Sequence, residues 1–333
     1  MITMKSKLLC RAWPELFKEF ETRQSTFYAV IDIKVKPHLP QWMLTSDTIF
    51  WVDRPEAQKN LKTYEALINF FLERRISRSC VLYVIGGGAT TDLAGFFAAT
   101  ILRGISWISV PTTILGMVDA SIGGKVAVNM AQGKNLVGAF YHPEKIYICH
   151  EFLTSLPQEE VESGKGEILK YGFLSKKIHQ QILGQEKIEN IAFECALLKE
   201  QIVERDFTEK SERMLLNLGH TLGHAFELTL NIPHGIAVGM GMRYILEIFG
   251  DSSFLKDWDM MCSALGLDQA KYHLSAYPSF SSDQFKKYLG QDKKKSENKI
   301  KLVLVRNIGD CYIQEMDLNE FFKKIEGHAE FYR

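Results

Sequence analysis

Short apolar runs alternate with helical patterns over the first half of the chain. The runs at 27–32, 80–85 and 105–110 are rich in β-branched and aromatic residues, and each ends in a polar or glycine-rich stretch. Such runs are typical of buried strands. Residues 59–75 place apolar side chains at helical spacing, and 90–101 form a second helical pattern directly after three glycines. The alternation predicts an α/β layer with a parallel sheet.

The pattern changes after about residue 157. Long helical stretches follow, such as 188–205 and 214–230, and only 299–305 is predicted to be a later strand. Pro157 followed by acidic residues is a plausible helix start. We therefore expect a Rossmann-like α/β domain over 1–157, suited to a nucleotide cofactor, and a mainly α-helical domain over 158–333 that binds metal and substrate.

Composition and charge narrow the class of protein. The 333 residues include 40 Lys plus Arg against 40 Asp plus Glu, so the chain has no overall field that would attract nucleic acid or an anionic membrane. The six cysteines are scattered without a C-x-x-C pair, which favours reduced thiols. The amino terminus resembles neither a secretory signal nor a membrane span. We expect a soluble cytoplasmic protein with a small-molecule substrate.

Two features of the first half indicate a nucleotide site. Gly86, Gly87 and Gly88 lie between a strand and a helix, where backbone N–H groups can approach a phosphate. A plain tight turn explains these glycines equally well, because they do not match the G-x-G-x-x-G fingerprint. Asp32 closes its strand, where a carboxylate can accept hydrogen bonds from ribose hydroxyls or simply end the strand in a turn.

Glycine-rich segments also carry basic and amide side chains. Lys125 follows two glycines, and Lys134 and Asn135 follow a third. We expect these residues to lie in loops that bring ammonium and amide donors to a phosphorylated substrate. Solvated surface lysines are the alternative.

The histidines give the clearest indication of chemistry. His220 and His224 are four residues apart on a predicted helix, and His234 begins the next segment. A catalytic metal needs three protein ligands and an open position, and a carboxylate is an acceptable ligand. Glu167 is the candidate carboxylate, with Lys170 on the same helical face. Buried structural histidines are the alternative, and spacing leaves open which histidine binds metal and which transfers protons.

Taken together, the motifs resemble the 3-dehydroquinate synthases of the sugar phosphate cyclase family. The matches follow in order over roughly residues 55 to 310, and they read PEAQK, GGGATTDLAGF, LRG, VPTT, VDASIGGK, GKNLVGAF, GEILKYG, LLNLGHTLGHAFE, HGIAVGMGM and QDKKK. The sequence departs from the family pattern at Lys34, Thr91 and Ile236.

The resemblance implies a role for each matching residue. It makes Glu167, His220 and His234 ligands of Zn2+ or Co2+, and places His224 near the reacting substrate. Positions that hold NAD+ are matched by Asp32, Glu56, Lys59, Gly87, Gly88, Asp92, Thr112, Thr113, Lys134 and Ser155. Catalytic or substrate positions are matched by Asp119, Lys125, Asn135, Lys170, Lys199, Arg213, Asn217 and Lys293. Arg103 matches a residue that reaches the neighbouring subunit's site, and the resemblance implies a homodimer.

The implied reaction converts 3-deoxy-D-arabino-heptulosonate 7-phosphate to 3-dehydroquinate and phosphate without net redox change. Lys199, Arg213 and Asn217 favour a substrate with a carboxylate over a neutral sugar phosphate. Arg213 lies seven residues before His220, so one helical face presents both if the helix is continuous. The alternatives are another sugar phosphate cyclase, a metal-dependent alcohol dehydrogenase of similar fold, or a catalytically silent protein that binds metal and nucleotide.

Overall fold

The chain folds into two units, as the computed structural model shows for residues 6–22, 26–291 and 298–332. Unit 1 contains the residues up to Pro157 together with Ala196–Glu204, and unit 2 contains Gln158–Cys195 and the residues from Arg205 onward. The division after Pro157 falls where the change of pattern predicts it. Nothing in the hydrophobic pattern predicts that Ala196–Glu204 is grouped with unit 1.

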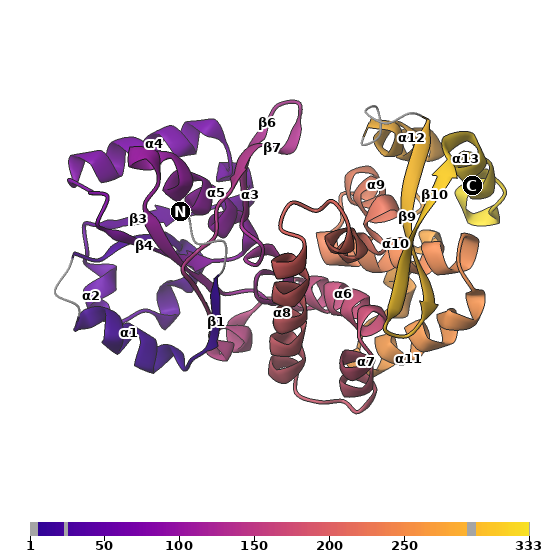
Figure 1. Ribbon diagram of the computed structural model, residues 1–333, viewed down its shortest axis with the longest axis horizontal. Helices are drawn as coiled ribbons and strands as arrows, with labels where there is room; N and C mark the ends of the chain where they lie inside the picture. The colour runs from indigo at the N-terminus through magenta and orange to yellow at the C-terminus, as the bar shows by residue number, and fades with distance from the viewer. Residues whose placement is uncertain (1–5, 23–25, 292–297, 333) are drawn as a thin grey trace. The chain divides into compact units, whose positions relative to one another are not determined.

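Six parallel strands form the sheet of unit 1 in the order β1-β8-β5-β4-β2-β3 (Figure 1). Their bounds are β1 Lys7–Cys10, β2 Tyr28–Asp32, β3 Ile49–Val52, β4 Val81–Gly86, β5 Ser106–Pro111 and β8 Lys145–Ile148. The parallel sheet is confirmed, and β2, β4 and β5 are the three predicted strands. The other three strands have only four residues each, which is too short for a clear hydrophobic period.

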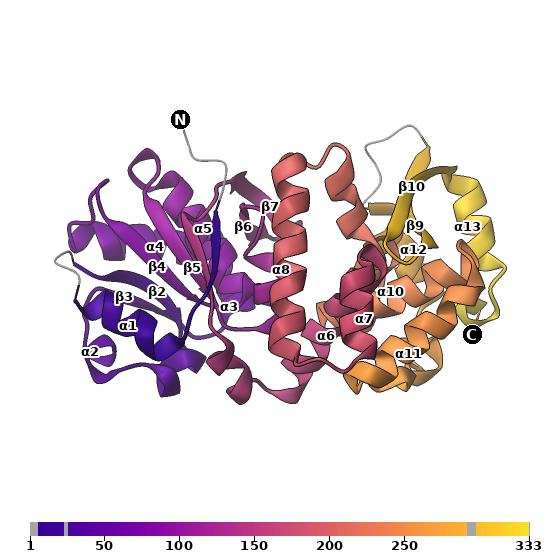
Figure 2. The same ribbon diagram turned by 60° about the horizontal axis from the view of Figure 1, so that its bottom comes forward.

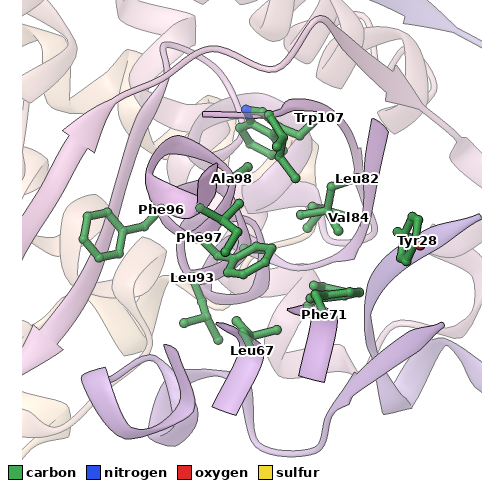
Figure 3. Packing of buried hydrophobic residues seen from close by; sticks show 14 of the residues in the cluster. Tyr28, Leu67, Phe71, Leu82, Val84, Leu93, Phe96, Phe97, Ala98 and Trp107 are labelled. Carbon is green, nitrogen blue, oxygen red and sulfur yellow. The ribbon is translucent and has the colours of Figure 1, made fainter. Parts of the chain in front are cut away.

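Helices cover both faces of this sheet, because successive strand residues point to opposite sides. Leu82 and Val84 of β4 belong to one core cluster with side chains of α4 (Leu61–Glu73) and α5 (Gly88–Thr100) (Figure 3). Tyr83, between them, faces the other way and meets Phe20 of α1 (Trp13–Glu21), with ring centroids 4.4 Å apart. The remaining helices of this part are α2 Gln41–Leu44 and α3 Pro55–Gln58.

A separate antiparallel hairpin joins β5 to β8. It consists of β6 (Lys125–Met130) and β7 (Gly133–Phe140). Val126 and Val128 are buried in the same core cluster as α5, so β6 packs on that helix. The prediction that Lys125, Lys134 and Asn135 lie in loops was therefore wrong, because all three belong to strands of this hairpin. Gly138 in β7 allows the two strands to approach closely, since a Cβ there would lie 2.4 Å from the Val126 carbonyl oxygen.

Unit 2 is mainly helical, as predicted (Figure 2). Its helices are α6 Gln158–Leu174, α7 Lys176–Leu183, α9 His220–Leu230, α10 His234–Ile248, α11 Leu255–Leu265, α12 Ser282–Gln291 and α13 Leu318–Glu326. Helix α8 (Ile188–Arg205) begins in unit 2 and continues into the stretch grouped with unit 1. The predicted late strand is β9 (Lys299–Asn307), but it pairs with β10 (Asp310–Asp317), which was missed because its sequence mixes charged and apolar residues. Among the described residues no helix is long and apolar enough to cross a membrane.

The predicted helix over 214–230 is interrupted. A short 3-10 helix covers Glu212–Asn217, and α9 starts only at His220. Gly219 lies between them with a φ of 81°, which a continuous α-helix does not allow. That backbone conformation favours glycine, and a Cβ there would lie 2.6 Å from the carbonyl oxygen of Val238 in α10. Close approach of α9 to α10 thus requires Gly219. Gly219 also determines where α9 begins, and therefore the position of His220.

Candidate active site

Three potential metal ligands converge in unit 2. Glu167 lies in α6, whereas His220 and His234 are the first residues of α9 and α10. One ligand atom from each lies within 4.8 Å of the other two. Ligands about 2.1 Å from a tetrahedral zinc ion are roughly 3.4 Å apart, so small side-chain movements would complete the coordination. Two imidazoles and one carboxylate are a donor set that suits zinc or cobalt.

Each imidazole is oriented by a hydrogen bond at Nδ1. In His220, Nδ1 lies 3.2 Å from the Leu218 carbonyl oxygen, and Nε2 faces Glu167 Oε1 at 3.5 Å. In His234, Nδ1 lies 2.8 Å from Glu227 Oε2. Acceptors at Nδ1 favour the tautomer whose Nε2 carries the lone pair, which is the form that binds metal through Nε2.

The surroundings of Glu167 and His220 are buried and charged. Glu167 is fully buried, and its Oε1 lies 2.8 Å from Nζ of buried Lys170. Burial lowers the pKa of His220, against the Glu167 carboxylate, which raises it. Burial therefore favours the neutral imidazole of His220, which is the form that binds a metal.

His224 does not join this group. It is one turn further along α9 and is exposed, with its ring 5.4 Å from that of His220 and 5.8 Å from that of His234 (centroid distances). The geometry therefore distinguishes residues that spacing left ambiguous. Glu167, His220 and His234 can hold an ion, and His224 lies beside them on the exposed side of α9.

The residues expected to bind a carboxylate lie before the break at Gly219. Arg213 is 2% exposed, and its Nη1 donates to the Phe207 carbonyl oxygen at 2.7 Å. The condition that one continuous helix carries Arg213 and His220 is not met, because of the left-handed residue between them. Arg213 is thus a buried arginine and not an exposed surface residue.

The segment before Arg213 is held by one carboxylate. Asp206 accepts backbone N–H groups of Lys210, Ser211 and Arg213 at 2.7–3.0 Å. These hydrogen bonds, first the one from Lys210, lower the pKa of Asp206 to about 2. In the same segment Asn217 Nδ2 donates to Glu209 Oε1 at 2.7 Å.

In unit 1 six of the predicted cofactor residues lie at the carboxyl ends of β2, β4 and β5, which are neighbours in the sheet: Asp32, Gly87, Gly88, Asp92, Thr112 and Thr113. Glu56 and Lys59 instead follow β3, Lys134 lies in β7, and Ser155 follows β8. Helix α5 begins directly after β4, with Gly87 as its N-cap, and no side chain caps its first turn. A Cβ at Gly88 would lie 2.8 Å from that of Ala120. The start of α5 therefore offers backbone N–H groups to an anionic ligand, as expected of a phosphate site.

Two carboxylates flank this helix start. Asp32 is buried, and its Oδ1 accepts the Lys34 N–H at 3.0 Å. Asp92 Oδ2 lies 2.5 Å from Lys59 Nζ, and burial raises the pKa of Asp92 to about 6 although the lysine lowers it. Both remain oriented by neighbours before any ligand arrives.

Other predicted residues of unit 1 form pairs. Lys199 Nζ lies 2.8 Å from Asp119 Oδ1, and Lys199 is in the part of α8 that belongs to unit 1. Ser155 Oγ lies 2.6 Å from His38 Nε2, and Thr113 Oγ1 accepts the Gly116 N–H at 3.0 Å beside Thr112. Lys293 lies outside the described residues.

Sequence reasoning missed two residues that orient others. Glu227 could have been predicted from the sequence, because metal-binding histidines commonly donate to a carboxylate. It lies three residues after His224 in the same motif. Asn129 was not detectable from any motif. It bonds to Glu56 and to the backbone of Asn135.

The fold and the three-residue cluster define a class: an α/β unit with a phosphate-binding helix start, joined to a helical unit with a metal site. Family models match this arrangement, the 3-dehydroquinate synthase N-terminal domain over residues 49–163 and its C-terminal domain over 164–295. The 3-dehydroquinate synthase of Clostridium kluyveri is 38% identical over 288 residues, covering 82% of this chain and 79% of that one. That of Staphylococcus epidermidis is 35% identical over 289 residues, covering 84% and 81%. The chain belongs to the 3-dehydroquinate synthase family.

Solved structures of other cyclases share the fold. A 2-epi-5-epi-valiolone synthase from Streptomyces hygroscopicus with NAD+ and Zn2+ bound has a TM-score of 0.83 at 18% identity, covering 98% of this chain and 97% of that one. A 2-deoxy-scyllo-inosose synthase complexed with carbaglucose-6-phosphate, NAD+ and Co2+ has a TM-score of 0.78 at 22% identity, with 97% of each chain covered. An iron-containing alcohol dehydrogenase from Corynebacterium glutamicum is more distant, with a TM-score of 0.61 at 16% identity over 97% and 94%.

Proposed function

We propose that this chain converts 3-deoxy-D-arabino-heptulosonate 7-phosphate to 3-dehydroquinate and phosphate, the second step of the shikimate route to aromatic amino acids. The observation that carries the proposal is the cluster of Glu167, His220 and His234 in a member of the 3-dehydroquinate synthase family. When bound, NAD+ would supply a hydride acceptor that is regenerated in each turnover, and Zn2+ or Co2+ a Lewis acid.

The residues of unit 2 would hold the metal and the acid group of the substrate. Lys170 would orient the Glu167 carboxylate through its 2.8 Å contact. Arg213 offers a guanidinium that can hold a carboxylate through two parallel hydrogen bonds. With Asn217, it favours a sugar acid over the neutral sugars of other cyclases. His224 would take up or release the proton at an imidazole nitrogen.

The residues of unit 1 would hold the cofactor and the phosphorylated end of the substrate. The first N–H groups of α5 suit the cofactor phosphates. Its ribose and nicotinamide groups would be bound by side chains of the same sheet edge and its neighbours, namely Asp32, Glu56, Lys59, Asp92, Thr112, Thr113, Lys134 and Ser155. Lys125 and Asn135 of the hairpin, and Asp119 with its partner Lys199, would contact the substrate.

The test is a measurement of phosphate and NADH in the same reaction. We expect phosphate release from the heptulosonate phosphate to require NAD+ while NADH absorbance stays flat, because the hydride is returned. Stoichiometric NADH formation would instead indicate a metal-dependent alcohol dehydrogenase. Binding of metal and NAD+ without phosphate release would indicate a silent binding protein.

We also propose that the protein works in the cytoplasm as a homodimer in which Arg103 completes the neighbouring subunit's site. Arg103 is exposed and has a φ of 67°, so a strained turn after α5 presents its side chain. Mixing inactive Arg103→Ala and His220→Ala proteins should restore part of the activity, since a mixed dimer contains one site with neither substitution. No recovery after verified subunit exchange would contradict this role.

A further inference from the structure

Asn129 lies where the β6–β7 hairpin meets α3 and the residue after it, and both the oxygen and the nitrogen of its amide are hydrogen-bonded. Its Oδ1 accepts the backbone N–H of Asn135 at 2.9 Å, and its Nδ2 donates to Glu56 Oε1 at 2.8 Å. Its backbone N–H donates to the Lys59 carbonyl oxygen at 2.7 Å. One residue therefore ties the hairpin to a segment some seventy positions earlier in the chain, a separation of 73 residues for the bond to Glu56.

The chemistry of this position requires an amide. Asparagine has one acceptor and one donor group, and here the acceptor faces an N–H while the donor faces a carboxylate. An aspartate could still accept from Asn135, but it would place a second carboxylate beside that of Glu56. The position therefore favours asparagine over aspartate, although the two side chains have nearly the same shape.

The three partners are functional candidates. Glu56 and Lys59 are assigned to NAD+, and Lys59 continues to Asp92 through a 2.5 Å ion pair. Asn135 is assigned to the substrate, and its φ of 58° is a left-handed conformation that its anchored N–H helps to fix. The orientation of the Glu56 carboxylate and the backbone conformation of Asn135 thus depend on the same amide, that of Asn129.

We propose that Asn129 is a positioning residue that holds Glu56 and Asn135 in their binding-competent arrangement, and so sets the affinities for cofactor and substrate together. The roles of its partners rest on the proposed function. The hydrogen bonds themselves are contacts within unit 1 and do not depend on that function.

The test replaces the donor that faces Glu56 with an acceptor and keeps the acceptor that faces Asn135. Asn129→Asp should raise the NAD+ dissociation constant about tenfold, because a hydrogen bond to a charged group is replaced by repulsion. Its KM for the heptulosonate phosphate should rise as well, with a smaller change in kcat. In a Glu56→Gln background the same substitution should change either constant less than about twofold, because the glutamine amide can donate to the aspartate.

The matched control is Asn190→Asp. Asn190 Nδ2 donates to Glu186 Oε1 at 2.9 Å on the surface of unit 2, the same chemistry away from the proposed cofactor residues. It should leave both constants unchanged. Equal losses from Asn129→Asp in the unmodified and the Glu56→Gln backgrounds, or an unchanged NAD+ dissociation constant, would overturn the positioning role. If the unmodified protein binds no NAD+, the proposed function falls as well, so the two failures are distinguishable.

Discussion

The two units hold their functional side chains in different ways. In unit 2 the metal ligands come from three helices packed closely through glycines, and Glu167 and Lys170 are completely buried. In unit 1 the functional side chains follow the ends of strands or lie on a hairpin, and Lys125 and Asn135 are exposed. The first arrangement fixes positions before a ligand arrives, whereas exposed side chains of the hairpin such as Lys125 are able to adjust.

The difference has an energetic side. A buried carboxylate and ammonium stabilise the fold only as a pair, and removing one partner costs about 3–5 kcal/mol. Contacts such as Asn129–Glu56 are partly solvated, so each contributes about 1 kcal/mol or less to stability. Substitutions of the buried pair in unit 2 should therefore affect metal content and folding, while those at exposed hairpin positions of unit 1 should affect affinity with little change in stability.

The largest expected effect is loss of the metal. His220→Ala should remove stoichiometric metal and lower turnover by more than about 100-fold, since even residues that only orient ligands change affinity 10–100-fold. His224→Ala is the matched control, expected to lose turnover but keep the metal. Metal analysis of both purified proteins checks this. Full metal content in His220→Ala would show that the cluster is not the binding site.

The next largest effect is expected at Glu227, whose carboxylate accepts a hydrogen bond from His234 Nδ1. Glu227→Ala should weaken metal binding about 10–100-fold by releasing the imidazole from its orientation. Glu227→Gln should cost less, because its amide oxygen still accepts from Nδ1. Competition with a chelator measures both affinities. Glu326→Gln, which breaks only an exposed ion pair with Lys286, should change nothing, and an equal effect of all three substitutions would exclude a local role for Glu227.

Arg213→Ala tests recognition of the substrate acid. Loss of a charge-assisted contact worth about 1.5–3 kcal/mol should lower kcat/KM at least tenfold and up to about 100-fold, with normal metal content. The measurement compares the heptulosonate phosphate with an analogue that lacks the carboxylate. Because Arg213 is buried and also bonds to Phe207, Arg213→Lys is included as a less disruptive variant. An equal loss for both substrates would refute carboxylate recognition.

The smallest effect is the pH dependence of NAD+ binding. With its pKa raised to about 6, Asp92 is ionised above that pH, and in the proposed function this is the form that accepts hydrogen bonds from the cofactor. Affinity should fall several-fold as pH drops through 6, and Asp92→Asn should remove this dependence. The folding stability of the ligand-free protein should change with pH in the opposite direction to the NAD+ affinity. The Asp92 carboxyl binds its proton more tightly in the folded than in the unfolded chain, so the free energy of unfolding decreases as pH rises from about 4 to 6. Titrations of NAD+ between pH 5 and 8 check the first statement, and a profile unchanged by Asp92→Asn would contradict it.

The parts predicted correctly from sequence have strong periodic signals or short-range spacing. Strands β2, β4 and β5 are apolar runs, and His220, His224 and His234 lie within fifteen positions. What could not be predicted depends on long-range packing. The turn at Gly219 is left-handed because α10 approaches there, and no local pattern records that approach. For the same reason, the hydrogen bond from Asn129 to Glu56 joins residues 73 positions apart.

The path of helix α8 has a consequence for recombining this protein with its relatives. Lys199, the partner of Asp119, lies in the stretch Ala196–Glu204 that belongs to unit 1 although it follows part of unit 2 in the sequence. The two family models meet between residues 163 and 164, which is inside helix α6. A chimera with a single crossover there would take Asp119 and Lys199 from different parents and divide a helix. Two further crossovers, near residues 195 and 205, are needed to exchange unit 1 as a whole.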